Sequence, residues 1–132
     1  MYFGADYYPE HWPRERWDVD AKLMKEAGFN LIRVAEFAWA KLEPSEGHWD
    51  FGWLDDALDV FYKYGIQVVM GTPTATPPKW LMDKHPEIYK RDENDLVLGF
   101  GSRRHYCYNS EIYREYSEKI VEKMAQHYAN HP

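Results

Sequence analysis

The sequence predicts an α/β fold made of tandem strand–helix units with parallel strands. Short apolar runs rich in β-branched residues alternate with segments of helical periodicity. The two helix exits also nearly repeat, as EAGFNLI at 26–32 and KYGIQVV at 63–69. Because each exit leads through a glycine into a short strand, the chain reads as repeated units whose strands run parallel. At 132 residues it has the length of one domain with a sizeable core.

The first two units are predicted from apolar spacing and from glycine and proline. A strand at 2–7 ends before Pro9, and a helix at 14–27 carries its apolar residues at helical spacing, with Gly28 after it. These residues are Trp17, Ala21, Leu23, Met24 and Ala27. A strand at 31–34, a loop at 35–51 and a helix at 54–62 ending near Gly65 complete the second unit.

The third unit begins with a buried strand from Ile66 that stops at Gly71. The threonine- and proline-rich loop that follows runs to Trp80, and such exits from buried parallel strands are where α/β proteins place chemistry. We expect this loop to be extended, with hydroxyls bonded to neighbouring loops. A short helix at 77–84, a polar turn at 91–95 and a last helix capped by Asn109 or Ser110 follow. The expected inner face of that helix is Tyr113, Tyr116, Ile120, Met124 and Tyr128.

Composition excludes several classes of function. A net charge of −6 without a basic stripe argues against a nucleic-acid partner. No apolar run reaches the length of a membrane span, and the single cysteine, Cys107, excludes an intrachain disulfide, so we expect a cytoplasmic protein without a membrane partner. Aromatic residues make up 17% of the chain and are either sugar-binding platforms or core.

Four motifs in order resemble the opening of glycoside hydrolase family 42 β-galactosidases, and together they span essentially the whole chain. They are YYPEHWP (7–13), RVAEFAWAKLEPSEGHWDF (33–51), GTPTATPPKWL (71–81) and GSRRHYC (101–107). The resemblance implies a TIM (β/α)8 barrel, retaining hydrolysis of terminal β-D-galactosides and a homo-oligomer, commonly a trimer. Residues 1–132 are then expected to be a partial catalytic domain: the first three βα units, truncated before the fourth strand.

The resemblance also implies that the chain holds no catalytic residue. In the family the acid/base glutamate follows an asparagine at the end of the fourth strand, and the nucleophilic glutamate ends the seventh. Both positions fall beyond Pro132, so we expect the chain alone to be inactive, because retaining hydrolysis needs two carboxyl groups across the scissile bond.

Four residues are candidates for substrate binding. Arg103 matches the arginine that holds galactose in the family, and a planar guanidinium suits paired hydroxyls; the alternative is a surface arginine. Glu36 either faces the pocket or makes structural hydrogen bonds. His11 and Trp12 either line the sugar pocket or pack within a loop. Glu43 is expected instead to fix the turn before the second helix.

Cys107 matches a cysteine that ligates zinc in family members with a downstream cysteine cluster. Alone it supplies one of the four ligands of a structural zinc, so a free thiol is the alternative. His105, two residues away, is weak support for a metal. We expect no required cofactor, with a structural zinc possible only in the full-length protein.

Two further functions belong to other classes. The chain is alternatively a non-catalytic structural module that self-associates through its open strand edges, since unpaired edges recruit partners. A sugar-binding module is the other alternative, and it rests on the aromatic content and Arg103.

Overall fold

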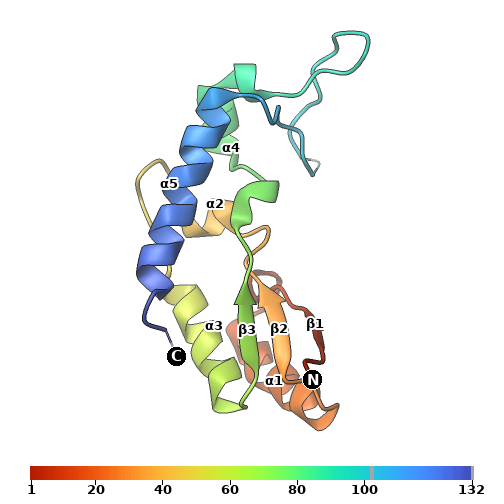
Figure 1. Ribbon diagram of the computed structural model, residues 1–132, viewed down its shortest axis with the longest axis vertical. Helices are drawn as coiled ribbons and strands as arrows, with labels where there is room; N and C mark the ends of the chain where they lie inside the picture. The colour runs from red at the N-terminus through yellow and green to blue at the C-terminus, as the bar shows by residue number, and fades with distance from the viewer. Residues whose placement is uncertain (102, 132) are drawn as a thin grey trace. The chain divides into compact units, whose positions relative to one another are not determined.

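The computed structural model describes residues 1–101 and 103–131 (Figure 1). Ser102, inside the 101–107 motif, and Pro132, where the predicted truncation falls, lie outside the described residues. The chain forms two compact units, Met1–Glu36 with Asp50–Gly71 and Phe37–Trp49 with Thr72–Pro132. Each unit is described by itself.

The first unit contains a three-stranded parallel sheet in the order β1-β2-β3, as the tandem pattern predicts. The strands are β1 (Gly4–Asp6), β2 (Leu31–Val34) and β3 (Gln67–Met70). β1 is shorter than the predicted 2–7, because its pairing with β2 extends only over its three residues. One register row across the sheet consists of Asp6, Arg33 and Val69.

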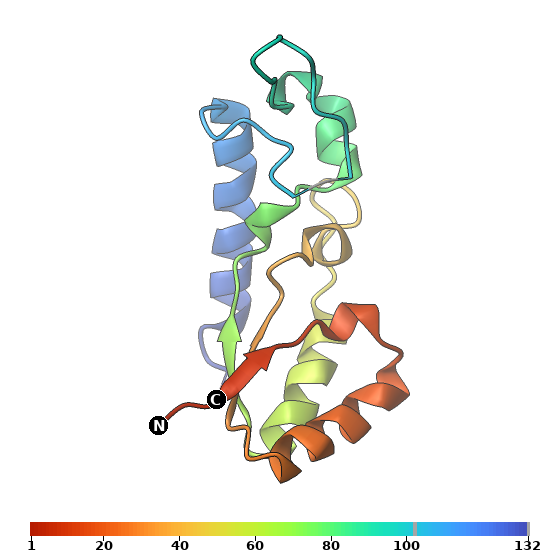
Figure 2. The same cartoon turned by 90° about the vertical axis from the view of Figure 1, so that its right-hand side faces the viewer.

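Helices α1 (Arg14–Glu26) and α3 (Gly52–Lys63) complete this unit, and the turn η1 (Pro9–His11) precedes α1. α1 packs on α3, and α3 packs on β3. Consecutive right-handed crossovers place both helices on one side of the sheet (Figure 2). Gly28 and Gly65 end the helices with positive φ angles of 86° and 65°. Of the apolar residues spaced along α1, Trp17 and Ala21 are buried, whereas Leu23 is 52% exposed.

The two faces of the sheet differ in burial. Ile32 and Val34 are buried, whereas Arg33 on the same strand is exposed and Val69 on β3 is 45% exposed. Successive side chains on a strand point to opposite faces, so one face is covered and the other is open. This is the arrangement of the first βα units of a barrel, whose inner face needs further strands to close it.

The second unit is mainly helical and corrects two predictions. Its elements are α2 (Trp39–Leu42), η2 (Pro73–Ala75), α4 (Lys79–Lys84), η3 (Pro86–Ile88) and α5 (Glu111–Tyr128). Residues 35–51 therefore include a helix, which is too short for periodicity to reveal. The threonine- and proline-rich loop is not fully extended, because the φ angle that proline fixes also suits the 3₁₀ turn η2.

Ser110 caps α5, since its hydroxyl accepts a hydrogen bond from the Tyr113 amide at 3.2 Å. The predicted inner face of α5 is buried except at Tyr128, which is half-buried. Trp39 is fully buried in the second unit, whereas Trp12 of the first unit is 49% exposed, so the aromatic residues serve both core and surface. None of the described helices has the length and apolarity needed to cross a membrane.

Candidate functional site

The loop after β3 is held by hydrogen bonds to other segments of the second unit. The Thr76 hydroxyl donates to the Phe37 carbonyl at 3.1 Å. The Tyr113 hydroxyl donates to the Thr74 carbonyl, which ties α5 to the same loop. The expected role of this loop as a support for neighbouring loops therefore has direct contacts behind it.

Arg103 lies on the exposed surface of the second unit, with its guanidinium carbon 4.2 Å from the centroid of the Phe37 ring. The adjacent Arg104 adopts a left-handed conformation with φ of 59°. Its amide donates to the Ala75 carbonyl at 3.4 Å, which connects the arginine segment to η2. The guanidinium is thus stacked on an aromatic ring while its N–H groups stay accessible.

Glu43 is a buried acceptor, as its predicted structural role requires. It is only 3% exposed, and its carboxylate accepts hydrogen bonds from Trp39 Nε1 at 2.8 Å and the Gly47 amide at 2.9 Å. The Trp80 indole also donates to the Glu43 carbonyl at 2.9 Å. These contacts hold the segment between α2 and α3, which contains the predicted turn before the helix at 54–62.

Glu36 lies directly beyond the carboxyl end of β2, in the first unit. Its carboxylate forms an ion pair with Arg33 at 3.5 Å. The preceding Ala35 is fully buried with φ of 71°, a conformation that costs a non-glycine residue free energy and persists only where its surroundings impose it. Gly71, just after β3, lies very close to the end of β2. A Cβ at this position would lie 3.0 Å from the Val34 carbonyl oxygen and 3.3 Å from Glu36.

His11 and Trp12 line the same pocket of about 430 Å³ in the first unit. Arg16 lies in its wall with its guanidinium carbon 5.7 Å from the Trp12 ring, and its Nε donates to Asp20 at 2.6 Å. An aromatic face beside an arginine–carboxylate pair is suited to a polar ligand with an apolar side. Glu36 is not among the described residues that line this pocket.

The Tyr7 hydroxyl closes the polar side of this pocket by donating to Asp20 at 2.9 Å. Burial raises the pKa of Tyr7 well above its ordinary value, and the Asp20 carboxylate raises it further. Tyr7 therefore stays protonated at physiological pH and acts there as a hydrogen-bond donor.

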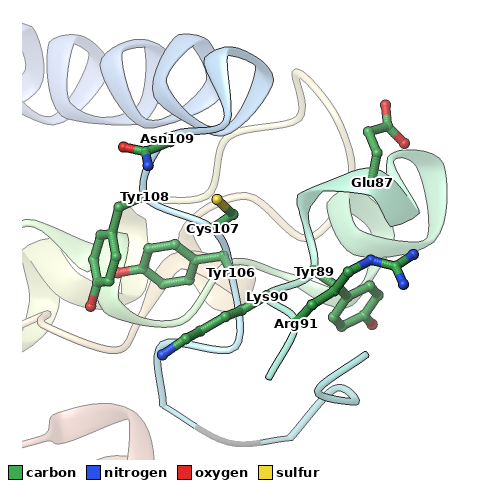
Figure 3. A pocket seen from close by; sticks show the side chains of 8 residues that line it. All are labelled: Glu87, Tyr89, Lys90, Arg91, Tyr106, Cys107, Tyr108 and Asn109. Carbon is green, nitrogen blue, oxygen red and sulfur yellow. The ribbon is translucent and has the colours of Figure 1, made fainter. Parts of the chain in front are cut away.

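Cys107 is half-buried and lines a pocket of about 530 Å³ in the second unit (Figure 3). The pocket lies between residues 87–91 and residues 106–109. Backbone hydrogen bonds join these segments, from the Lys90 amide to His105 and from the Cys107 amide to Ile88. The cations Lys90 and Arg91 and the acidic Glu87 also line the pocket, so charged groups of both signs lie around it.

The described residues do not by themselves assemble a zinc site at Cys107. In the part of the chain that the structure describes, no three His, Cys, Asp or Glu side chains gather closely enough to hold a metal ion. His105 is only 2% exposed and packs among aromatic rings, with Phe100 at 5.1 Å and Tyr89 at 5.8 Å between centroids. A structural zinc therefore requires ligands beyond those described.

The structure brings some of the predicted site residues together and adds others. His11 and Trp12 share a pocket, Glu36 is paired with Arg33, and Arg103 is stacked on Phe37. Sequence reasoning did not find the roles of Phe37 or Arg33. The Phe37 contact joins residues far apart in the chain, which no local periodicity signals, whereas the three-residue spacing of Arg33 and Glu36 was visible but lies outside any helix.

Comparison with known proteins gives one consistent answer. The sequence profile of the β-galactosidase family matches residues 6–132. The β-galactosidase of Thermus thermophilus is 53% identical over 125 residues, which are 95% of this chain and 19% of that protein. The chain thus spans about a fifth of the length of such curated relatives.

Solved structures agree with the sequence comparison. The β-galactosidase of the psychrophilic Marinomonas ef1 matches with a TM-score of 0.95 and 49% identity, covering 100% of this chain and 20% of that one. A catalytic mutant of Gan42B, a β-galactosidase of G. stearothermophilus with a glutamate changed to alanine, matches with a TM-score of 0.94 and 35% identity over the same shares. A profile match over nearly all of the sequence, with relatives of this identity, establishes that the chain belongs to glycoside hydrolase family 42.

Proposed function

We propose that this chain forms the N-terminal part of a retaining β-galactosidase that hydrolyses terminal non-reducing β-D-galactosides. It contributes residues 1–132, the first three βα units of the catalytic barrel, and a share of the galactose subsite through Arg103. The observation that carries this proposal is the match to the Marinomonas ef1 enzyme along the whole chain at 49% identity, over only 20% of that enzyme.

The chain alone is proposed to be inactive. Retaining glycosidases use two carboxyl groups about 5–5.5 Å apart, one as acid and base and the other as nucleophile. Two loop glutamates near the predicted site already have structural partners, since Glu36 pairs with Arg33 and Glu43 accepts two N–H groups. The catalytic mutant of Gan42B supports an essential glutamate in a relative. We place both catalytic glutamates of this protein beyond residue 132.

The remaining proposals concern cofactors, assembly and location. Catalysis by paired carboxylates needs no cofactor, and Cys107 would hold a structural zinc only with ligands from outside this chain. We propose a homo-oligomer, a trimer by family resemblance, that acts in the cytoplasm without nucleic-acid or membrane partners. The net charge of −6 supports the exclusion of nucleic acid.

The alternative is a non-catalytic module that self-associates through its open edges. The exposure of all three β1 residues and of Val69 favours it, because an unpaired edge beside an open sheet face is a site for strand pairing. A stable symmetric oligomer of the purified chain, with no affinity for galactose, would support this alternative. Mass measurement by light scattering and a galactose titration distinguish the two.

The test of the main proposal uses a chromogenic β-galactoside and two proteins. The first is the 132-residue chain, for which we expect no turnover. The second is a hybrid enzyme in which residues 1–132 replace the matching segment of the Thermus thermophilus β-galactosidase, for which we expect turnover. Activity of the chain alone at the level of a whole enzyme would refute the placement of the catalytic pair.

A further inference from the structure

Arg103 is held against an aromatic ring more closely than other cations of the second unit. Its guanidinium carbon lies 4.2 Å from the Phe37 centroid, whereas Lys119 lies 4.8 Å from the Tyr116 ring and Lys79 lies 5.8 Å from the Phe100 ring. A cation within about 6 Å of a ring centroid is attracted by the negative face of the ring. The short distance places the guanidinium over the Phe37 ring in close cation–π contact.

Both partners of the stack are anchored to one short segment, residues 74–76. The Phe37 carbonyl accepts from the Thr76 hydroxyl at 3.1 Å, and the amide next to Arg103, that of Arg104, donates to Ala75 at 3.4 Å. The Tyr113 hydroxyl fixes the same segment from α5. Residues 74–76 therefore hold the backbone of Phe37 and the backbone beside Arg103 close to each other, although the two residues lie far apart in the sequence.

Stacking leaves the chemistry of the arginine intact. The five N–H donors of a guanidinium lie in its plane and point outward from its edges, whereas stacking uses only its face. Phe37 has no polar group that would compete for these donors. An exposed arginine without such a ring samples many rotamers, so the ring restricts the orientation of the donor fork without occupying it.

We propose that Phe37 is a positioning residue for Arg103, holding its guanidinium so that the N–H edges face the hydroxyls of a galactoside. This inference rests on the proposed function for its ligand, and on the stack itself for its geometry. Phe37 acts through Arg103 and does not need to touch the sugar.

The test compares Phe37→Leu, which removes the ring at similar volume, with Phe37→Tyr, which keeps it. In the isotope-labelled chain, the Nε–H resonance of Arg103 reports the ring, because a proton near an aromatic face is shifted. We expect Phe37→Leu to move this resonance toward the position of a free arginine and Phe37→Tyr to leave it in place. In the hybrid enzyme we expect Phe37→Leu to raise KM about two- to fivefold with little change in kcat, and Phe37→Tyr to restore KM.

Phe100→Leu is the matched control, because it removes a ring of the same unit over which Lys79 rather than Arg103 lies. An unmoved Arg103 resonance in Phe37→Leu, an equal movement in Phe100→Leu, or an unchanged KM in Phe37→Leu would overturn the proposal. If the unsubstituted hybrid is inactive, the proposed galactosidase function fails, and the resonance alone decides whether Phe37 orients Arg103.

Discussion

At the scale of single residues, Arg103 is the side chain through which we propose that this chain recognises a sugar. Its exposed guanidinium is stacked on Phe37, which leaves its donor edges accessible. A lysine would keep the charge but lose the planar pair of donors.

We therefore expect Arg103→Lys in the hybrid enzyme to raise KM for a β-galactoside about tenfold or more, the cost of losing hydrogen bonds to a charged donor. The control is Arg104→Lys, at the neighbouring exposed position, with an expected change of less than about twofold. Steady-state kinetics of the two variants decide the matter, and equal effects would show that only the local charge is used.

Glu43 illustrates a charged residue whose role is structural. Its buried carboxylate accepts from the Trp39 indole and the Gly47 amide. Glu43→Gln turns one acceptor into a donor facing an N–H group, so we expect the free energy of unfolding to fall by about 1–3 kcal/mol. Urea unfolding followed by tryptophan fluorescence measures this loss. Glu93→Gln, at an exposed position, serves as the control, and an equal loss there would contradict the structural role of Glu43.

At the scale of elements, Glu46 links α4 to α5. Its carboxylate accepts from Lys84 at 2.5 Å and from the Tyr116 hydroxyl at 2.7 Å, and these bonds lower its pKa below the ordinary 4.5. Because the folded-state pKa is lower than the unfolded one, this contribution to stability is present above pH 4.5 and is lost as the pH falls through the folded value.

Glu46→Gln is thus expected to flatten the dependence of unfolding free energy on pH in the acid range below 4.5. Urea titrations of both proteins across that range measure the slope. The same slope in both proteins would show that the Lys84 and Tyr116 contacts do not favour the ionised carboxylate.

The pairing of β1 with β2 depends on the absence of a side chain at position 4. A Cβ on Gly4 would lie 1.6 Å from the Leu31 carbonyl oxygen, so the strands would have to separate. Gly4→Ala is expected to lower the free energy of unfolding by at least about 3 kcal/mol, at the upper end for overpacking. Gly99→Ala, where a Cβ would meet nothing within 4 Å, should change it by less than about 0.5 kcal/mol. A tolerated Gly4→Ala would disprove the close approach.

Elements with strong local signals could be predicted from the sequence, and those fixed by distant contacts could not. The periodic spacing and glycine ends located α1, α3 and β2 closely. α2 was missed because its four residues are too few to display a helical period. The exposure of Leu23 was also missed, since spacing alone does not say how wide the buried stripe of a helix is.

In the candidate site, too, residues within a motif could be predicted from the sequence, whereas their distant contact partners could not. The motif predicted Arg103, but its partner Phe37 comes from a segment more than sixty residues earlier in the chain and has no sequence signal. Glu36 and Glu43 look alike in the sequence, and only the structure distinguishes the ion pair of one from the buried hydrogen bonds of the other. Roles that depend on tertiary partners require the fold.

At the scale of the whole molecule, the chain has the fold of an enzyme family and, on our account, lacks its catalytic pair. The open sheet face, with Arg33 and Val69 exposed, is the inner face of a barrel that has too few strands to close. The chain spans about a fifth of the length of its curated relatives, in keeping with our proposal that the catalytic glutamates belong to other residues.

The most direct test of this account is β-galactoside hydrolysis by the hybrid enzyme, measured beside the chain alone and beside the Thermus thermophilus enzyme without its matching segment. We predict turnover by the hybrid and none by either part, because we propose that the subsite and the catalytic pair come from different segments of one barrel. Turnover by the chain alone, or a correctly folded hybrid that binds no galactoside, would contradict the account.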